Sequence, residues 1–453
     1  MTSLLVRGAE VVVTMDDAGS EIAGGAVYAE DGWIRQVGPA ATLPGTADRV
    51  VDASGSVVLP GLINTHHHLS QTLTRALPGA QNAGLFDWLR VLYPVWARLT
   101  PDHVRTATMT GLAELALSGC TTAFDHQYLW PGGSRLDDQM EAADVIGIRF
   151  HGSRGSMSVG ESGGGLPPDE VVEDEDEILE DCVRVIDAFH DAAPGSMRQV
   201  ALAPCSPFSV STGLMARTAE LARRHGVRLH THLAETADEE EYCRATFGRR
   251  PVEYAADTGW LGEDVWFAHA VHVDEQEIGR MAETGTGVAH CPTSNMRLGS
   301  GIAPVAGFMR SGVLVGLGVD GSASNDSSHM LAEVRQAMLL ARLAGSIVPA
   351  AGPQMTARQA LRLATRGGAA ILGRSDIGSL EVGKVCDMIA IDVGGIDHAG
   401  FADPVAGVVF ASPGRVRHTI VHGRLIVEDG RLMSADEAEL AAAHRRLAAA
   451  LVA

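Results

Sequence analysis

The sequence lacks the features of a membrane or secreted protein. Its 453 residues contain no uninterrupted apolar run of the roughly 18 residues that a membrane-spanning helix needs. The N-terminal segment has only a short apolar run without a small-residue cleavage site, so we expect no secretory signal. The six cysteines include no C-x-x-C pair, a scatter that predicts reduced thiols rather than a disulfide framework. These absences predict a cytoplasmic protein that does not enter a membrane.

Basic residues are also scarce. There are 35 Lys and Arg residues against 56 Asp and Glu residues, which gives a formal net charge of −21. A surface with this excess of negative charge repels the phosphates of nucleic acids and of anionic membranes, so we expect neither as a partner. A small, uncharged or weakly charged substrate fits this composition.

Two catalytic motifs are missing. The zinc-deaminase signature that ends in P-C-x-x-C is absent, because neither Cys205 nor Cys291 has a second cysteine three positions further on. The glycine-rich stretch at residues 163–165 is not followed by Lys-Ser or Lys-Thr, so it does not form a phosphate-binding loop. The sequence therefore offers no ready assignment from these local signatures.

Both ends of the chain are rich in short β-type runs separated by turn residues. The runs are residues 4–7, 10–14, 25–29 and 33–37 near the N-terminus, and 388–393, 416–421 and 424–428 near the C-terminus, with His422-Gly423 as a hairpin turn. We predict one small β-sandwich domain built from residues 1–57 and 375–433. Residues 434–453 are predicted to form a C-terminal helix with little catalytic content.

The middle of the chain alternates short apolar runs with helical patterns. The eight runs are residues 58–64, 121–125, 146–151, 199–203, 227–232, 265–269, 287–291 and 313–319. Helical periodicity lies between most of them, at residues 104–117, 177–191, 213–225 and 275–284, and continues after the last at 332–343 and 357–371. Strands that are apolar on both faces and alternate with helices indicate a parallel sheet. We therefore predict an α/β fold, a (β/α)8 TIM-like barrel over residues 58–374.

Polar side chains recur where these predicted strands end. Four of the eight runs end in or near such residues: His66 and His68, then His232 with Glu235, then His269, and finally Asp320. In a barrel of this kind the carboxyl ends of all strands meet at one mouth, where active sites form. We therefore expect these six side chains to lie close together.

Neutral imidazoles and a carboxylate suit a divalent transition ion such as zinc. Alternate residues of an extended segment point the same way, so His66 and His68 face the ion while His67 points away. The sequence predicts one catalytic ion held by His66, His68, His232 and Asp320. The same ligands also bind Fe²⁺, so the sequence does not distinguish a zinc site from an iron site.

The residues around the predicted ion suggest hydrolysis. A bound divalent ion lowers the pKa of its water to roughly 7. Asp320 is then placed to accept a proton from that water, and Glu235 to pass a proton to a ring nitrogen or a leaving group. His269 is expected to polarise the group under attack or to hydrogen-bond the nucleophile.

A structural interpretation competes for each histidine taken alone, because a single histidine at a strand end is more often a surface or core residue. The coincidence at four strand ends favours a metal site over that interpretation. We interpret His67 and His230 as supporting or structural residues. Trp88, Trp96 and Tyr93 have helical spacing and are more often core residues than substrate stackers, although Trp88 is kept as a binding candidate.

Several segments together resemble a known family. They are Pro60-Gly-Leu-Ile-Asn-Thr-His-His-His68, His232-Leu-Ala-Glu235, Ala268-His269, Gly318-Val-Asp320-Gly-Ser, and the returning β segment 378–387. In combination they resemble the amidohydrolase superfamily over essentially the whole chain. The absence of a metal-bridging lysine implies a one-metal site. Glu235, His269 and Asp320 resemble the branch that deaminates heterocycles.

Within that branch, further segments are similar to the 8-oxoguanine deaminases of bacteria. They include Gln71-Thr-Leu-Thr-Arg, Asp125-His-Gln-Tyr, Arg154-Gly-Ser-Met-Ser and Leu202-Ala-Pro-Cys-Ser-Pro-Phe-Ser. The resemblance implies that water displaces ammonia from the 2-amino carbon of 8-oxoguanine and leaves uric acid. It matches Gln71 to a glutamine that reads the purine edge, a task suited to an amide. We list Gln71, His126, Arg154, Cys205 and Trp88 as candidate substrate-binding residues, with a structural ion pair as the other interpretation of Arg154.

Two further hypotheses remain open. The triazine hydrolases are the next resemblance, and the same residues serve an amino- or chlorohydrolase acting on s-triazines, isocytosine, pterins or guanine. The third hypothesis, from a different class, is a catalytically silent binding protein on the same barrel. The resemblance also implies a homo-oligomer, a dimer or larger.

Overall fold

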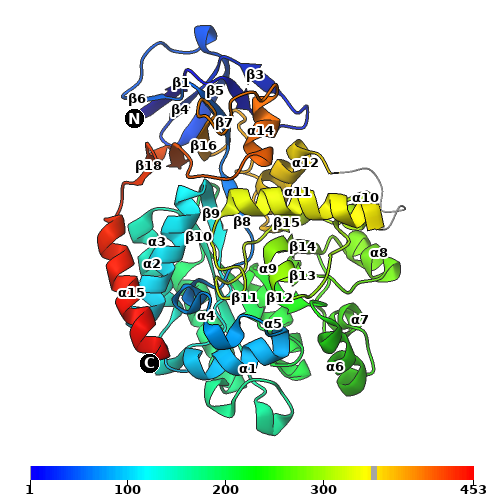
Figure 1. Cartoon of the computed structure of the whole chain (residues 1–453). Helices are drawn as coiled ribbons and strands as arrows, with labels where there is room; N and C mark the ends of the chain where they lie inside the picture. Colours follow the sequence, from blue (N-terminus) through cyan, green and yellow to red (C-terminus); the bar gives the residue numbers. More distant parts are fainter. Residues whose placement is uncertain (1, 348–354) are drawn as a thin grey trace.

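The computed structural model describes residues 2–347 and 355–453, which form a closed barrel and two further sheets. Figure 1 shows the sheets from the chain ends gathered at one end of the molecule, with the barrel and its helices below them. The prediction of a TIM-like barrel carrying a β sandwich is confirmed.

Eight parallel strands close the barrel in the order β10-β11-β12-β13-β14-β15-β8-β9. Their bounds are β8 (Leu62–Asn64), β9 (Cys120–Phe124), β10 (Arg149–Ser156), β11 (Arg198–Pro204), β12 (Arg228–Leu233), β13 (Val265–His269), β14 (Gly287–His290) and β15 (Val315–Leu317). Each predicted run thus contributes a barrel strand. β15 is shorter than predicted, because the Val319 amide donates to the Asn64 side chain at 2.9 Å instead of to a neighbouring strand.

The first predicted run was wrong as a single strand. It divides into β7 (Ser56–Pro60), which pairs with β16 of the β domain, and β8, which joins the barrel. Gly61 lies between them, where a Cβ atom would stand 2.0 Å from the Thr121 hydroxyl oxygen. A glycine is therefore required where the chain passes from one unit into the other.

The β domain draws on both chain ends. One sheet has the order β5 (Trp33–Pro39), β4 (Gly25–Glu30), β1 (Ser3–Arg7), β6 (Arg49–Asp52). The other has the order β19 (Arg431–Leu432), β18 (Arg424–Glu428), β17 (His418–Val421), β16 (Met388–Asp392), β7, β2 (Val11–Val13), β3 (Glu21–Ala23). Apolar side chains of both sheets share one core, including Val6, Ile34, Val58 and Met388. The sequence did not predict β3, β6 and β19, which are short and carry few apolar residues.

Helices surround the barrel. They are α1 (Leu85–Trp96), α2 (Pro101–Leu117), α3 (Leu136–Ile146), α4 (Glu175–Phe189), α5 (Thr212–His225), α6 (Ala237–Phe247), α7 (Pro251–Asp257), α8 (Glu275–Thr284), α9 (Pro292–Arg297), α10 (Val305–Ser311), α11 (Met330–Ile347), α12 (Ala357–Arg362), α13 (Gly368–Ile371), α14 (Pro404–Phe410) and α15 (Glu437–Val452). The predicted helix 357–371 is interrupted by a π turn at Leu363–Gly367. Local signals set many ends: Asp274 caps α8, which stops at left-handed Gly285.

The C-terminal helix α15 runs beside α2 (Figure 1). Its Leu451 is 2% exposed and belongs to the same apolar cluster as Trp88 and Trp96 of α1. His444 of α15 also lies 3.1 Å from the Thr72 hydroxyl, close to the segment that follows His68. The end of the chain therefore supports the helix that forms one wall of the cavity described below.

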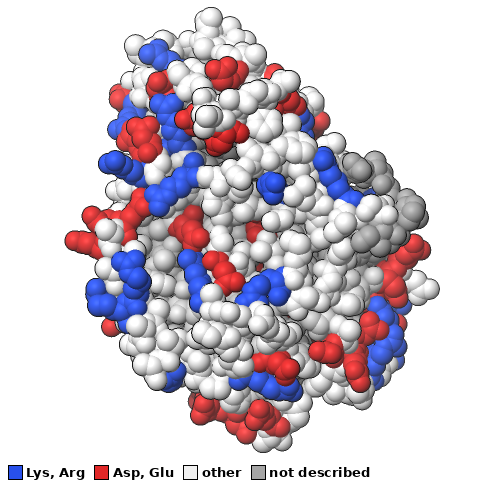
Figure 2. Space-filling model, viewed as in Figure 1, with Lys and Arg blue, Asp and Glu red and all other residues white. Residues whose placement is uncertain are grey.

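Charged side chains of both signs are interspersed over the face shown in Figure 2. In the described part of the chain, no helix combines the length and the apolar composition needed to cross a membrane.

A buried ion pair joins the β domain to the barrel. Arg149, at the start of β10, is fully buried and lies 3.1 Å from Asp387, which precedes β16. Asp387 also accepts from the His422 amide at 2.7 Å, and Arg149 also donates to the Gly195 carbonyl at 2.9 Å. Removing one member of such a pair leaves a buried charge without its partner.

We expect Asp387→Ala to lower the free energy of unfolding by about 3–5 kcal/mol, because the Arg149 guanidinium stays buried. Urea unfolding followed by tryptophan fluorescence measures the change. Asp257→Ala is the control, since its partner Arg249 is exposed and the pair contributes less than about 1 kcal/mol. Equal losses in the two variants would contradict this account of the interface.

Candidate active site

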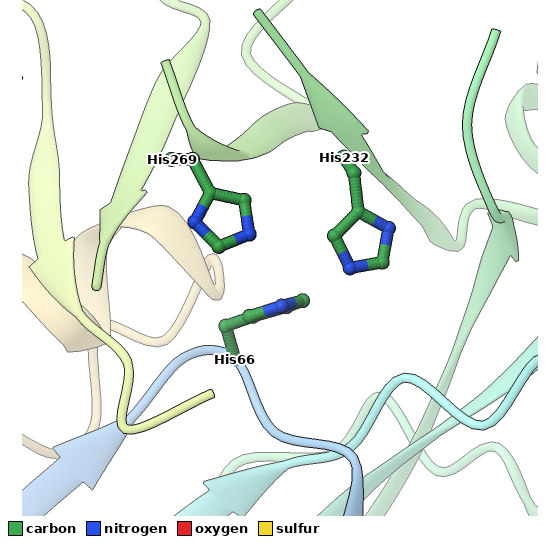
Figure 3. A group of neighbouring side chains, drawn as sticks. All are labelled: His66, His232 and His269. Carbon is green, nitrogen blue, oxygen red and sulfur yellow. The ribbon is translucent and has the colours of Figure 1, made fainter. Parts of the chain in front are cut away.

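The predicted site residues meet at the mouth of the barrel. His66 and His68 follow β8, His232 lies within β12, His269 ends β13, and Asp320 follows β15. In Figure 3 the rings of His66, His232 and His269 extend from three separate segments toward a common space. All of the side chains in this group are buried or nearly so.

Potential ligand atoms lie close together in this space. Asp320 Oδ1 is 3.2 Å from His66 Nε2 and 3.3 Å from His68 Nε2. His68 Nε2 is 3.0 Å from His232 Nε2. Atoms that bind one tetrahedral zinc ion at about 2.0–2.1 Å are separated by about 3.3 Å, so the observed spacing suits a single ion.

Backbone carbonyls determine the tautomers of two of these histidines. His68 Nδ1 lies 2.6 Å from the His126 carbonyl, and His232 Nδ1 lies 2.7 Å from the Cys205 carbonyl. A carbonyl only accepts hydrogen bonds, so each Nδ1 carries the proton and each Nε2 presents a lone pair. Two lone pairs facing each other at 3.0 Å repel, and a cation between them removes that repulsion.

His66 is oriented through a second histidine. His230 Nδ1 lies 2.8 Å from the Trp266 carbonyl, so His230 Nε2 is an acceptor. His66 Nδ1 lies 2.8 Å from that atom and must therefore be the donor. His66 Nε2 is left with a lone pair and has no hydrogen-bond partner among the described residues. His230 thus acts as the predicted supporting residue, and the donor set fits a divalent transition ion.

Other groupings of ligand atoms occur at the same place. His66, His232 and His269 also present nitrogens within 4.8 Å of one another, as do His66, His126 and His230. The second grouping uses nitrogens that the relay through His230 already occupies. We therefore favour the set that includes His68 and Asp320.

Three turns at the mouth are strained. His269 has a φ of 70° and Asp320 a φ of 63°, both in the left-handed region that side chains other than glycine rarely adopt. Ala234, next to Glu235, has a φ of 54°. Such conformations cost about 1–3 kcal/mol each and occur preferentially at functional sites, where they direct a side chain.

Glu235, His269 and Asp320 change one another's pKa values. Burial raises the pKa of Glu235 to about 7. Burial would lower the pKa of His269, but the nearby carboxylates of Glu235 and Asp320 outweigh it and raise the pKa. His269 Nε2 lies 3.6 Å from Glu235 and 3.9 Å from Asp320. Burial opposes ionisation of Asp320, yet the surrounding histidines hold its pKa well below the ordinary value.

A narrow cavity opens at this cluster, and His68, Glu235 and Asp320 contribute to its lining. Gln71, Trp88 and Cys205 all line it, as expected for substrate-binding candidates. The Gln71 side chain donates to the Tyr128 hydroxyl at 3.3 Å, while its carbonyl oxygen has no partner in the described chain. A glycine is needed at position 321, because a Cβ atom there would stand 1.9 Å from the side-chain oxygen of Gln71.

Two other candidates do not line the cavity. His126 stacks on His232 at a ring distance of 4.7 Å, and its Nε2 bonds to the Ala203 carbonyl. Arg154 is buried in ion pairs with Glu173 at 2.7 Å and Asp181 at 2.5 Å. The structure therefore favours the ion-pair interpretation of Arg154, and we place neither residue against a substrate.

The sequence reasoning missed several residues of the site. Tyr128 lines the cavity, and its position in the Asp125-His-Gln-Tyr segment was the only signal available. Ser324 donates to Asp320 at 3.0 Å. Asn295 lies 2.9 Å from His269 Nδ1, and nothing in the sequence pattern links these two residues.

Comparison with known proteins agrees with this geometry. The sequence profile of the Amidohydrolase family matches residues 57–426. The chain belongs to the amidohydrolase family. It is 48% identical to 8-oxoguanine deaminase of Pseudomonas aeruginosa, with 96% of each chain covered. It is 39% identical to hydroxydechloroatrazine ethylaminohydrolase of Pseudomonas sp. (strain ADP), with 98% of this chain and 94% of that one covered.

A solved structure is similar throughout its length. It is the atrazine chlorohydrolase TrzN of Arthrobacter aurescens TC1 complexed with zinc, with a TM-score of 0.93 and 34% identity. The match covers 99% of this chain and 100% of that one. This amidohydrolase therefore shares a complete fold with a zinc-binding relative.

We expect His230→Phe to weaken zinc binding about 10- to 100-fold, because His66 loses the acceptor that fixes its tautomer. Competition with a chelator of known affinity measures the change. His126→Phe is the control: it keeps a ring against His232 and removes only a bond to a backbone carbonyl. An unchanged zinc affinity in His230→Phe would contradict the proposed relay.

Proposed function

We propose that this amidohydrolase converts 8-oxoguanine and water into uric acid and ammonia. The observation that carries the proposal is a cavity, beside a histidine-carboxylate cluster, that presents polar groups to a flat ring. The relative named 8-oxoguanine deaminase, 48% identical over 96% of both chains, supports this substrate.

The side chains that line the cavity suit an oxidised purine in their chemistry. Its walls include the flat or apolar side chains of Trp88, Leu89 and Phe208, which suit the faces of a planar ring. Gln71 contributes a side-chain amide to the lining, and an amide suits the edge of a purine because it carries both a donor and an acceptor. Burial raises the pKa of Cys205 to about 12, so its thiol stays protonated and donates weakly to an oxygen of the substrate.

We propose one zinc ion per chain, bound by His66, His68, His232 and Asp320. The facing lone pairs and the fixed tautomers support a cation there, and the zinc complex of a relative supports its identity. Fe²⁺ remains the alternative, because the donor set accepts it. Zinc, when bound, supplies a hydroxide nucleophile at neutral pH.

The protein's own groups move the protons. Asp320, whose pKa is held low, accepts the proton of the attacking water. Glu235, with a pKa near 7, delivers a proton to the ring nitrogen next to the carbon under attack. His269 lies between these carboxylates and hydrogen-bonds the oxygen that adds. The proton held by Asp320 then passes to the amine, which leaves as ammonia, and Glu235 recovers a proton from the added hydroxyl group as the product carbonyl forms.

Hydrolysis of s-triazines is the second candidate. The hydroxydechloroatrazine ethylaminohydrolase and the triazine hydrolase structures favour it, since the same machinery acts on any electron-poor ring carbon that bears a leaving group. The lower sequence identity of these relatives makes it the weaker proposal. Deamination of isocytosine, pterins or guanine belongs to the same class.

The direct test is product release by the zinc-loaded protein from a panel of 8-oxoguanine, guanine, isocytosine, pterins and triazines, measured as ammonia for the amino-substituted rings and as alkylamine or chloride for the triazines. We expect 8-oxoguanine to have the highest kcat/KM, with uric acid appearing in equal amount. Higher kcat/KM for a triazine would replace the leading proposal with the second. Release from no member of the panel would favour a silent binding protein.

We expect Glu235→Gln to abolish measurable turnover while zinc content stays at one ion per chain, because the amide cannot transfer a proton. Ammonia release and metal analysis of the same preparation test both parts. Glu241→Gln, an exposed position on α6, is the control and keeps full activity. Turnover retained in Glu235→Gln would remove its assigned role.

We also propose that the protein acts in the cytoplasm, in the breakdown of oxidised purines, and as a homo-oligomer. All six cysteines are free and buried, which supports a reducing compartment. The oligomeric state stays a prediction from family resemblance.

A further inference from the structure

Glu333 is a buried carboxylate that the proposed chemistry does not use. It lies in the first turn of α11, is 1% exposed and does not line the cavity. Burying a carboxylate is costly unless hydrogen bonds compensate for the lost water. The partners of Glu333 therefore indicate what this position does.

One carboxylate oxygen holds the turn that carries Asp320. The Asn325 side-chain amide donates to Glu333 Oε1 at 2.7 Å and to the Val319 carbonyl at 2.6 Å. The Asn325 backbone amide donates to the Gly321 carbonyl at 3.0 Å. Asn325 thus spans the turn on both sides of Asp320, where the backbone is strained.

The other oxygen holds α9. The Thr293 amide donates to Glu333 Oε2 at 3.3 Å. Thr293 lies in the first turn of α9, which has no side-chain cap, so its amide needs an acceptor from elsewhere. Two residues later Asn295 bonds to His269 Nδ1 at 2.9 Å. The same carboxylate therefore reaches the helix that orients His269.

We propose that Glu333 is a positioning residue that fixes the Asp320 turn and α9 relative to each other, and so sets His269 against Asp320. This proposal rests on the proposed function for the roles of those two side chains. Other buried carboxylates hold two further segments at the strand ends. Glu239 accepts from the Ala234 and Glu235 amides at 2.8 Å, and Asp125 accepts from the Leu69 amide at 2.7 Å. Glu333 differs from both because one of its oxygens holds the turn that carries Asp320 and the other holds the helix that orients His269.

Glu333→Gln is the test variant. Glutamine has the same shape but only one acceptor oxygen, so one of the two bonds is lost. We expect kcat on 8-oxoguanine to fall about 10- to 100-fold, because small misplacements of reacting groups are costly. KM is expected to change less than kcat, since Gln71 and Trp88 lie on other segments and meet the Asp320 turn only at Gly321 and at the Ala323 carbonyl.

Glu277→Gln is the matched control. Glu277 is also buried, at 3% exposed; it accepts from the Asp274 amide and pairs with Arg250, and these contacts involve neither the Asp320 turn nor α9. We expect this variant to lower the melting temperature at least as much as Glu333→Gln does while leaving kcat unchanged. An equal loss of kcat in both variants would reduce Glu333 to a structural residue.

A double-mutant cycle tests the route of the effect. If Glu333 acts through Asn325, then Asn325→Ala combined with Glu333→Gln loses less activity than the two single losses multiplied. Strictly multiplicative losses would contradict the route through Asn325.

A second readout does not depend on turnover. Because the Asp320 turn is loosened, we expect zinc to transfer to a chromogenic chelator about tenfold faster from Glu333→Gln than from Glu277→Gln. If the unmodified protein acts on no panel substrate, the proposed function fails but the zinc measurement still tests Glu333. Equal zinc release and unchanged kcat in Glu333→Gln would overturn the inference.

Discussion

The arrangement of the active site depends on two imidazole nitrogens that face each other at 3.0 Å, His68 Nε2 and His232 Nε2. Backbone carbonyls take the protons of both rings on the opposite side, so neither nitrogen is able to donate to the other. Such a contact is repulsive in the absence of a cation. The barrel therefore holds a site that favours a bound metal, and much of the surrounding hydrogen bonding keeps it in that form.

Further buried polar groups hold the residues around these two nitrogens in place. The His230 relay fixes His66, while Glu239, Asp125 and Glu333 accept the amides of turns next to catalytic side chains. Burial raises the pKa of Asp125 to about 7, and that of Glu333 also to about 7. The strain at His269 and Asp320 persists because these contacts over-determine the turns.

The cavity separates binding from chemistry. Gln71 and Trp88 lie between the first and second barrel strands and Cys205 follows the fourth, whereas the proton-moving groups follow later strands. α15 supports the Trp88 wall from outside through Leu451. We therefore expect substitutions in the wall to change substrate preference more than they change the proposed proton transfers.

The sequence by itself determined the eight barrel strands and the β sheets built from both chain ends, because periodic burial is a local pattern. Polar residues at the strand ends pointed to the ligand set that we propose. It failed where the outcome depended on distant partners. The run at 58–64 divides since β7 pairs with β16, more than 300 residues away. Arg154 turns toward Glu173 and Asp181, and Asn295 meets His269, only because of how the loops pack. Which polar side chain faces the cavity was decided by tertiary structure, since hydrogen-bond partners for a buried group come from any part of the chain.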